Sequence, residues 1–147
     1  MTTLTAQTTQ VYSIVIKATP EQVWDAITNP EFTHRYFYGT LVSLSDAEYI
    51  SRGPVGNEMI RGAVLEIDPP QRLVHAWRSL WDPEQAKEDE SRVAWEIEPQ
   101  DGGITKLTVV HDRLEGAPKT AASVAGGWVF VLSGLKTLLE TGEPLTA

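Results

Sequence analysis

The chain has 147 residues, no cysteine, and 20 acidic against 12 basic residues, which gives a formal charge of −8. This length predicts a single domain over residues 1–147, with one core and a frayed segment at residues 1–10. The acidic balance argues against sequence-independent binding of nucleic acid or anionic lipid, because both need clustered Lys and Arg. Without cysteine there is neither a disulfide nor a thiolate, and a cytoplasmic protein is expected.

Neither of the two uncharged segments predicts targeting or membrane insertion. Residues 1–10 are rich in Thr and Gln and have no basic start or apolar centre, so they do not resemble a secretory signal. The longest uncharged stretch, residues 120–135, is shorter than the roughly 18 to 20 apolar residues that a membrane span needs. We therefore expect no membrane partner.

The first elements are a strand and two helices. Residues 11–17 alternate β-branched and polar side chains, which predicts a strand. A helix is predicted directly after it, because Thr19 suits the cap, Pro20 suits the first turn and Gln22 completes a Thr-x-x-Gln capping box. A second, shorter helix is predicted over residues 30–37.

The central part of the chain has the periodicity of a sheet. From residue 40 to residue 110 the apolar residues mostly recur at every second position, and turn signals interrupt them. This pattern predicts an antiparallel meander with strands near residues 40–44, 48–52, 57–67, 72–80, 91–98 and 104–111. The intervening segment 82–90 has six charged residues in nine, and we interpret it as a solvated loop without function.

A long amphipathic helix is predicted at the end of the chain. Its apolar residues follow helical spacing: Trp128, Val131, Leu132, Leu135, Leu138 and Leu139. Gly142 is suited to end it. An antiparallel sheet must bury one face, so the predicted class is α+β: a curved antiparallel sheet of about seven strands wrapped around this helix, with two short helices after the first strand. Such a wrap tends to leave a cavity.

Three sequence blocks carry a resemblance to a known superfamily. They are residues 16–28, residues 62–77 and residues 127–142, and together they extend over nearly the whole chain. In these blocks the chain resembles the START-like, helix-grip superfamily, in the branch named after the activator of the ninety-kilodalton heat-shock chaperone ATPase. The resemblance implies the helix-grip fold. It also implies a range of functions, because relatives bind lipids or hormones, cyclise or aromatise polyketides, or act as co-chaperones.

Our first functional hypothesis is that the chain binds a small hydrophobic molecule between the sheet and the long helix. Apolar residues exceed what one helix can cover, and five tryptophans could contribute to an aromatic wall. His75 is in phase with Trp77 and shares its face. The residues expected to contact the ligand are Tyr36, Phe37, His75, Trp77, Trp95, His111, Trp128, Val131 and Leu135.

The alternatives belong to other functional classes. An enzyme of cyclase, aromatase or dehydratase type could use His75, His111 or Tyr36 as acid or base, but the chain has no recognisable catalytic motif. Regulation of a chaperone ranks third, because the eukaryotic activators carry a separate N-terminal docking domain that one domain of this size lacks. The sequence also leaves a homodimer open.

No metal or other cofactor is expected. The three histidines, His34, His75 and His111, include no pair at the spacing that places two ligands on one element, and cysteine ligands are absent. A glycine-rich phosphate loop is also absent from the sequence.

Overall fold

The computed structural model describes residues 8–146. The elements in chain order are β1 (Gln10–Ile16), α1 (Pro20–Thr28), α2 (Pro30–Tyr36), β2 (Leu41–Leu44), β3 (Glu48–Arg52), β4 (Glu58–Asp68), β5 (Arg72–Ser79), α3 (Pro83–Ala86), β6 (Ser91–Gln100), β7 (Ile104–Asp112) and α4 (Pro118–Thr141). The strands form one antiparallel sheet of seven in the order β1-β7-β6-β5-β4-β3-β2. The predicted fold is therefore confirmed.

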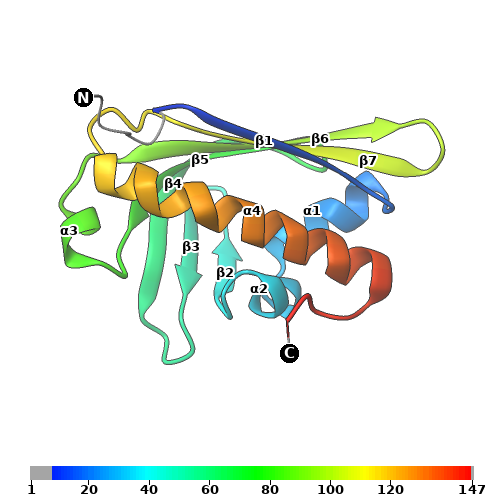
Figure 1. Cartoon of the computed structure of the whole chain (residues 1–147), viewed down its shortest axis with the longest axis horizontal. Helices are drawn as coiled ribbons and strands as arrows, with labels where there is room; N and C mark the ends of the chain where they lie inside the picture. Colours follow the sequence, from blue (N-terminus) through cyan, green and yellow to red (C-terminus); the bar gives the residue numbers. More distant parts are fainter. Residues whose placement is uncertain (1–7, 147) are drawn as a thin grey trace, which may run out of the picture.

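The sheet bends around α4. In Figure 1 the strands β1, β5, β6 and β7 lie above α4, whereas β2, β3 and β4 turn downward behind it. The helices α1 and α2 lie at one end of α4, and α3 lies at the other. The inner face of the sheet therefore packs against α4 and, at one end, also against α1 and α2.

The caps of the helices follow the sequence. The backbone N–H of Gln22 donates to Thr19 Oγ1 at 3.1 Å, and the N–H of Thr19 donates to Gln22 Oε1 at 2.8 Å, so the predicted capping box is confirmed. At the other end of the chain Gly142 has φ +80° and its N–H donates to Leu138 O. Its left-handed conformation ends α4 as predicted.

The first residues of the described chain are held in place. The predicted fraying falls on residues 1–10, of which 1–7 lie outside the described residues. Gln10 opens β1, is 5% exposed, and donates from Nε2 to Ala121 O at 3.0 Å. The described end of the chain is thus tied to α4, because a buried amide finds its partner there.

The helix α4 is the core helix. By length and composition alone it could cross a membrane, because it has 24 residues and few charges. Nine of its residues are instead buried inside the fold: Thr120, Ala121, Val124, Trp128, Val131, Leu132, Gly134, Leu135 and Leu138. The apolar composition of α4 therefore reflects the core that it forms with the strands.

The acidic loop before β6 differs from our interpretation of it as a solvated loop. It contains the short helix α3 and then Glu88, whose carboxylate accepts the backbone N–H groups of Lys119 and Thr120, both at 2.8 Å. It also accepts the hydroxyl of Thr120 at 2.7 Å. Residue Ala117 at the N-cap of α4 has no side chain for this task, so Glu88 caps the helix from another segment.

Removing this remote cap should destabilise the protein. Burial opposes ionisation of Glu88, but the hydrogen bonds from Lys119 and Thr120 outweigh it and lower its pKa. We expect Glu88→Ala to reduce the free energy of unfolding by about 1 kcal/mol, as for the loss of an N-cap. Urea denaturation at neutral pH measures this loss, and Glu90→Ala on the same exposed loop is the control. Equal losses in both variants would contradict a capping role.

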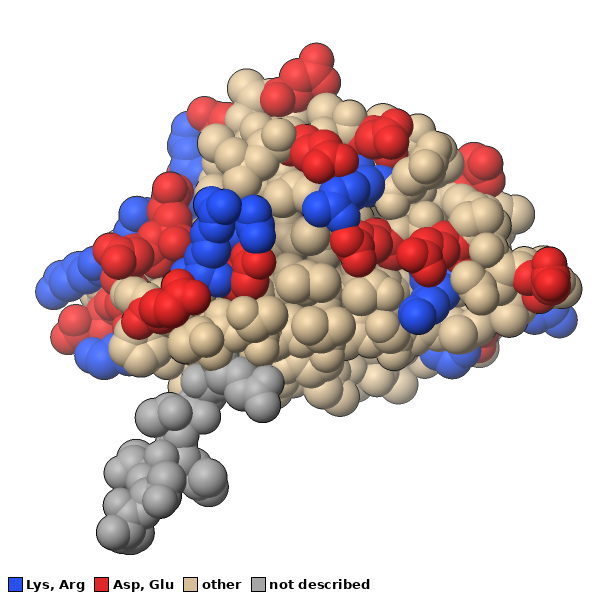
Figure 2. Space-filling view, turned by 90° about the horizontal axis from the view of Figure 1, so that it is seen from above, with Lys and Arg blue, Asp and Glu red and all other residues tan. Residues whose placement is uncertain are grey.

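Opposite charges lie side by side on the outer face of the sheet (Figure 2). Arg61 donates to the carboxylates of Glu48 at 2.8 Å and Glu58 at 2.9 Å, and Arg92 donates to Asp112 at 2.6 Å. These exposed or half-exposed pairs contribute little stability each. They mark this side as the solvent face, so the chemistry of interest lies on the inner face.

Candidate ligand-binding cavity

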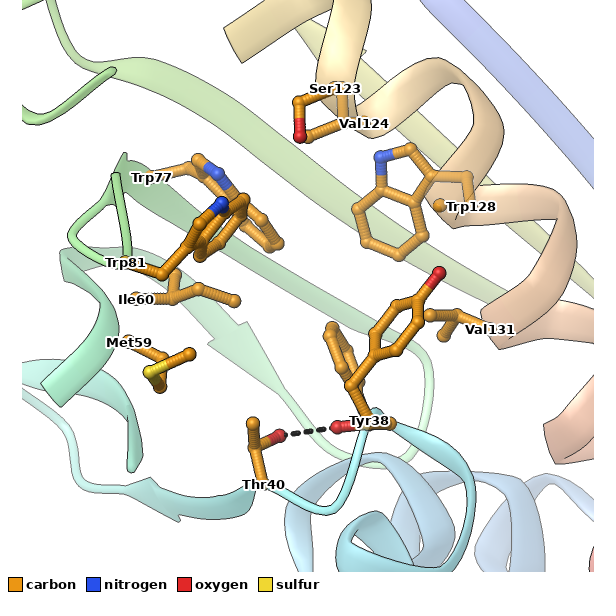
Figure 3. Close-up of a pocket in the computed structure, with 12 residues that line it drawn as sticks. Tyr38, Thr40, Met59, Ile60, Trp77, Trp81, Ser123, Val124, Trp128 and Val131 are labelled. Carbon is orange, nitrogen blue, oxygen red and sulfur yellow. Dashed lines mark hydrogen bonds between the residues drawn. The ribbon is translucent and has the colours of Figure 1, made fainter. Parts of the chain in front are cut away.

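A cavity of about 300 Å³ lies between α4, the inner face of the sheet and the loop after α2 (Figure 3). Its wall consists of aromatic, aliphatic and hydroxyl-bearing residues with one glycine: Phe37, Tyr38, Thr40, Met59, Ile60, Trp77, Trp81, Ser123, Val124, Gly127, Trp128 and Val131. None of these side chains is charged at neutral pH. Tyr38, Trp81 and Ser123 are exposed and therefore mark the mouth.

One face of α4 forms the helical side of the wall. Val124, Trp128 and Val131 lie four and seven residues apart, and each is at most 6% exposed. Gly127 lies between them without a side chain, and a Cβ built there would meet only the Tyr38 hydroxyl, at 3.7 Å. The missing side chain keeps the mouth open beside the helix.

A β-bulge in β4 directs Met59 into the cavity beside its neighbour Ile60. Ser51 of β3 pairs with Ile60 of β4, whereas the next residue, Arg52, pairs with Glu58. Met59 is therefore an extra residue of β4 that has no partner in β3. This irregularity explains why the adjacent residues Met59 and Ile60 both line the cavity, although successive residues of a regular strand point to opposite faces.

Tyr38 closes part of the mouth. It follows α2 with φ +53°, in the left-handed region that a bulky residue rarely adopts. Its ring stacks on Phe130 of α4 with centroids 5.4 Å apart and planes 17° apart. Figure 3 shows the side chain reaching from the loop toward Trp128 and Val131. The loop and α4 thus meet through this aromatic pair.

The structure brings four of the nine predicted ligand contacts to the cavity wall. They are Phe37, Trp77, Trp128 and Val131. The other five differ from the prediction, because they lie outside this wall in the packed interior: Tyr36, His75, Trp95, His111 and Leu135. All five are at most 5% exposed. His75 and Leu135 lie on β5 and α4, which also supply the wall, whereas α2, β6 and β7, which carry the other three, supply none of it.

His111 is fixed from both sides of its ring. The indole N–H of Trp128 donates to His111 Nδ1 at 3.0 Å, so Nε2 must carry the ring proton. That Nε2 lies 2.8 Å from Ser91 Oγ, which in turn donates to Trp77 O at 3.3 Å. His111 therefore orients the indole of Trp128, which does line the cavity, without reaching the cavity itself.

Both ring nitrogens of His75 on β5 also have hydrogen-bond partners. The indole N–H of Trp95 donates to His75 Nε2 at 3.1 Å, and Nδ1 lies 2.9 Å from Ala76 O, to which it donates. The ring stacks on Tyr49 with centroids 3.8 Å apart. The neighbouring strand β4 approaches β5 closely at Gly62, where a Cβ would lie 1.7 Å from Ala76 O.

Both imidazoles are held neutral by burial. Desolvation lowers the pKa of His75 to about 4, against a smaller opposing effect of its hydrogen bond to Ala76. Desolvation also lowers the pKa of His111 to about 3, and the neighbouring His75 adds to the shift. The unprotonated nitrogen of each ring already accepts a hydrogen bond from an indole N–H. A proton added to this nitrogen would point at the indole proton, which disfavours the charged imidazolium. These groups are poorly placed to exchange protons with a ligand.

The remaining acid–base candidate is also occupied. The Tyr36 hydroxyl donates to Ala26 O at 2.8 Å, and burial raises its pKa well above the usual range. Tyr49 in the same core differs, because its buried hydroxyl has no hydrogen-bond partner in the described part of the chain. Within residues 8–146 no group of three His, Asp or Glu side chains could hold a metal ion.

Some residues of the wall could have been found from the sequence and others not. Val124 lies four residues before Trp128 and seven before Val131, so the helical spacing places it on their face. Tyr38 and Met59 give no such signal, because their positions depend on a positive φ and on a bulge. Thr40, Ile60, Trp81, Ser123 and Gly127 were also missed.

Comparison with known proteins identifies the family and the fold. The sequence matches the family described as Activator of Hsp90 ATPase homolog 1-like protein over residues 17–140. No curated protein sequence matches the chain. Among solved structures, CalU16 from Micromonospora echinospora has a TM-score of 0.70 at 21% identity, over 91% of this chain and 77% of that chain.

Two further solved structures have similar folds. PFC0360w, an HSP90 activator from Plasmodium falciparum, has a TM-score of 0.71 at 20% identity, over 90% of this chain and 96% of that chain. The Aha1 dimer from Colwellia psychrerythraea has a TM-score of 0.71 at 17% identity, over 92% and 98%. These similarities support the helix-grip fold, and the match over residues 17–140 covers most of the chain. The protein therefore belongs to the Activator of Hsp90 ATPase homolog 1-like family.

Proposed function

We propose that the protein binds a small hydrophobic molecule in the cavity between α4 and the sheet. The observation that carries this proposal is a cavity of about 300 Å³ whose wall has no charged side chain. A cavity of this size and composition falls within the range of small-molecule sites in proteins. Displacing water from such a wall favours the binding of an apolar molecule.

The wall is arranged around aromatic rings. Trp128 lies at its centre, with the ring centroid of Trp77 at 5.6 Å and that of Phe37 at 6.2 Å. The hydrogen bond to His111 fixes the Trp128 indole from behind. A side chain that is already ordered loses little conformational freedom when a ligand arrives, so the wall is prepared for binding.

The enzyme alternative has less support. A general acid or base must come within about 2.6 to 3.2 Å of the proton that it transfers, or act through one water. His75, His111 and Tyr36 do not line the cavity, and each has its own partner in the core. No imidazole or carboxylate is among the lining residues. Binding without chemistry is the function that this wall supports best.

Regulation of a chaperone is the second candidate, and family membership is the observation that favours it. It requires a protein–protein contact and makes no use of the cavity. One measurement distinguishes ligand binding from chaperone regulation. Stimulation of the ATPase activity of a purified Hsp90 by this protein, unchanged in a variant with a blocked cavity, would support the second candidate.

A variant at the mouth tests the binding proposal. We expect Gly127→Leu to abolish the binding of N-phenyl-1-naphthylamine, a neutral dye that fluoresces in apolar sites, because the new side chain fills the mouth. The same change should raise the free energy of unfolding by up to about 1 kcal/mol, since Leu favours helix over Gly. Fluorescence titration and thermal melting measure the two effects. Lost binding with retained or higher stability cannot be attributed to unfolding.

The adjacent glycine provides the control. Gly126 is exposed, does not line the cavity, and has no atom within 4 Å of a Cβ built on it. Gly126→Leu should give a similar gain in stability and leave the affinity for the dye unchanged. Absence of dye binding to the unsubstituted protein, or equal binding by both variants, would overturn the proposal.

A further inference from the structure

The cavity also indicates the chemical class of its ligand. Resting on the proposed function, we propose that the ligand is an uncharged, flat aromatic molecule with one hydrogen-bonding group, and that this group stays at the mouth while the rings enter. Three properties of the wall carry this inference: its charge, its shape and the position of its unused polar groups.

The absence of charge in the wall argues against an ionised group inside the cavity. A carboxylate or sulfonate buried against apolar atoms needs a cation or several hydrogen-bond donors, and otherwise its burial is strongly unfavourable. The cavity wall contains no Lys, Arg or His. The formal charge of the whole chain is −8, which further disfavours an anion. A carboxylate or a phosphate therefore does not suit the buried part of this site.

The shape of the wall favours rings. The indoles of Trp77 and Trp128 are inclined by 48°, and the Phe37 ring meets Trp128 edge to face at 71°. A flat ligand that lies against these rings can stack on one and meet the edge of another, which is the geometry that aromatic pairs prefer. The volume of about 300 Å³ equals that of about ten water molecules, at roughly 30 Å³ each. This space suits a few fused or linked rings.

The polar groups deep in the wall are already occupied. The indole N–H of Trp77 donates to Ser79 Oγ at 3.0 Å, and that of Trp128 donates to His111. The hydroxyl of Thr40 donates to Phe37 O at 2.7 Å, and the dashed line that starts at Thr40 in Figure 3 marks this bond. These groups have no remaining proton for a ligand, so the deep part of the cavity acts as an apolar surface.

The unused polar groups gather at the mouth. The hydroxyls of Tyr38 and Ser123 and the indole N–H of Trp81 make no hydrogen bond to another of the residues 8–146, and all three residues are exposed lining residues. They come from the loop after α2, from α4 and from the segment after β5. A ligand with a single hydroxyl or carbonyl gains most when that group points outward to these donors.

A matched series of naphthalenes tests this inference. Naphthalene, 2-naphthol and 2-naphthoate share one ring system and differ by a hydrogen, a neutral hydroxyl and a carboxylate. Their affinities are measured by displacement of N-phenyl-1-naphthylamine from the protein at neutral pH. We expect 2-naphthol to bind a few-fold more tightly than naphthalene and at least tenfold more tightly than 2-naphthoate.

Variants at the mouth identify the groups responsible. Tyr38→Phe with Ser123→Ala removes two hydroxyls and should reduce the advantage of 2-naphthol over naphthalene, with little change for naphthalene itself. Ser133→Ala, at an exposed position of α4 outside the cavity wall, is the control and should leave both affinities unchanged. Comparing two ligands on one variant separates a specific contact from a general change in the cavity.

The outcomes distinguish the inference from the proposed function. If the dye binds but 2-naphthoate displaces it as well as 2-naphthol does, the site accepts anions and the inference is wrong, while ligand binding stands. If naphthalene matches 2-naphthol, the mouth selects no polar group and that part of the inference is wrong. If the dye does not bind at all, the proposed function fails and the inference fails with it.

Discussion

Acidification from pH 6 to pH 4.5 is expected to lower the free energy of unfolding by roughly 2 to 3 kcal/mol per pH unit. The cause is the burial of His75 and His111, whose pKa values in the native protein are about 4 and about 3. In the unfolded chain both imidazoles bind a proton near pH 6.5. The unfolded state therefore binds more protons than the native state throughout this interval.

Because the unfolded state binds more protons, the free energy of unfolding decreases as the pH decreases. Each imidazole contributes about 1.4 kcal/mol per pH unit while only its unfolded form is protonated, and stability falls as the pH falls. Above about pH 7 both states are neutral and this dependence vanishes. Asp112 acts in the same direction at lower pH, because its hydrogen bond from Arg92 lowers its pKa. Between pH 6 and pH 4.5 the loss amounts to about 3 to 4.5 kcal/mol, a large fraction of the 5 to 15 kcal/mol that typically stabilises a domain.

Histidine variants test the assignment. His75→Gln or His111→Gln should reduce the slope of unfolding free energy against pH by about half, whatever each substitution costs at neutral pH. Denaturant titrations at several pH values between 4.5 and 7.5 give the slope directly. His34→Gln is the control, because His34 is exposed on α2. An unchanged slope in both core variants would mean that other groups cause the acid sensitivity.

The fold could be predicted from the sequence because its signals are local. The capping box at Thr19 and Gln22, the stop at Gly142 and the alternation in the strands each specify a backbone conformation within a few residues. The role of Glu88 could not be predicted in this way, because it caps a helix about thirty residues further along the chain. Contacts of this kind depend on the tertiary fold.

The cavity was harder to predict because periodicity gives the face of a residue but not its depth. Trp77 and Trp95 were both expected to line the cavity, yet Trp77 is in the wall and Trp95 packs with His75 in the core. The inner face of a curved sheet includes both regions. Where the helix fills the space and where it leaves a void depends on packing, which a single sequence does not reveal.

Leu135 and Val131 of α4 lie in the packed core and in the cavity wall, respectively. Truncating them should therefore have different effects. Leu135 is fully buried and lies outside the cavity wall, so Leu135→Ala should lower the free energy of unfolding by about 2 to 5 kcal/mol. Val131 lines the cavity, where part of its surface has no packing partner. Val131→Ala removes fewer atoms from that wall and should cost about 1 to 2 kcal/mol.

Ligand affinity should show the opposite pattern. Val131→Ala enlarges the cavity and should change the affinity for N-phenyl-1-naphthylamine, whereas Leu135→Ala should leave it nearly unchanged in the folded protein. Urea denaturation and dye titration on the same two variants provide both readouts. Because Leu135 and Val131 lie one turn apart on α4, a shared effect on the helix would alter both quantities in both variants. Such a parallel change would show that the boundary between packed core and cavity lies elsewhere on α4.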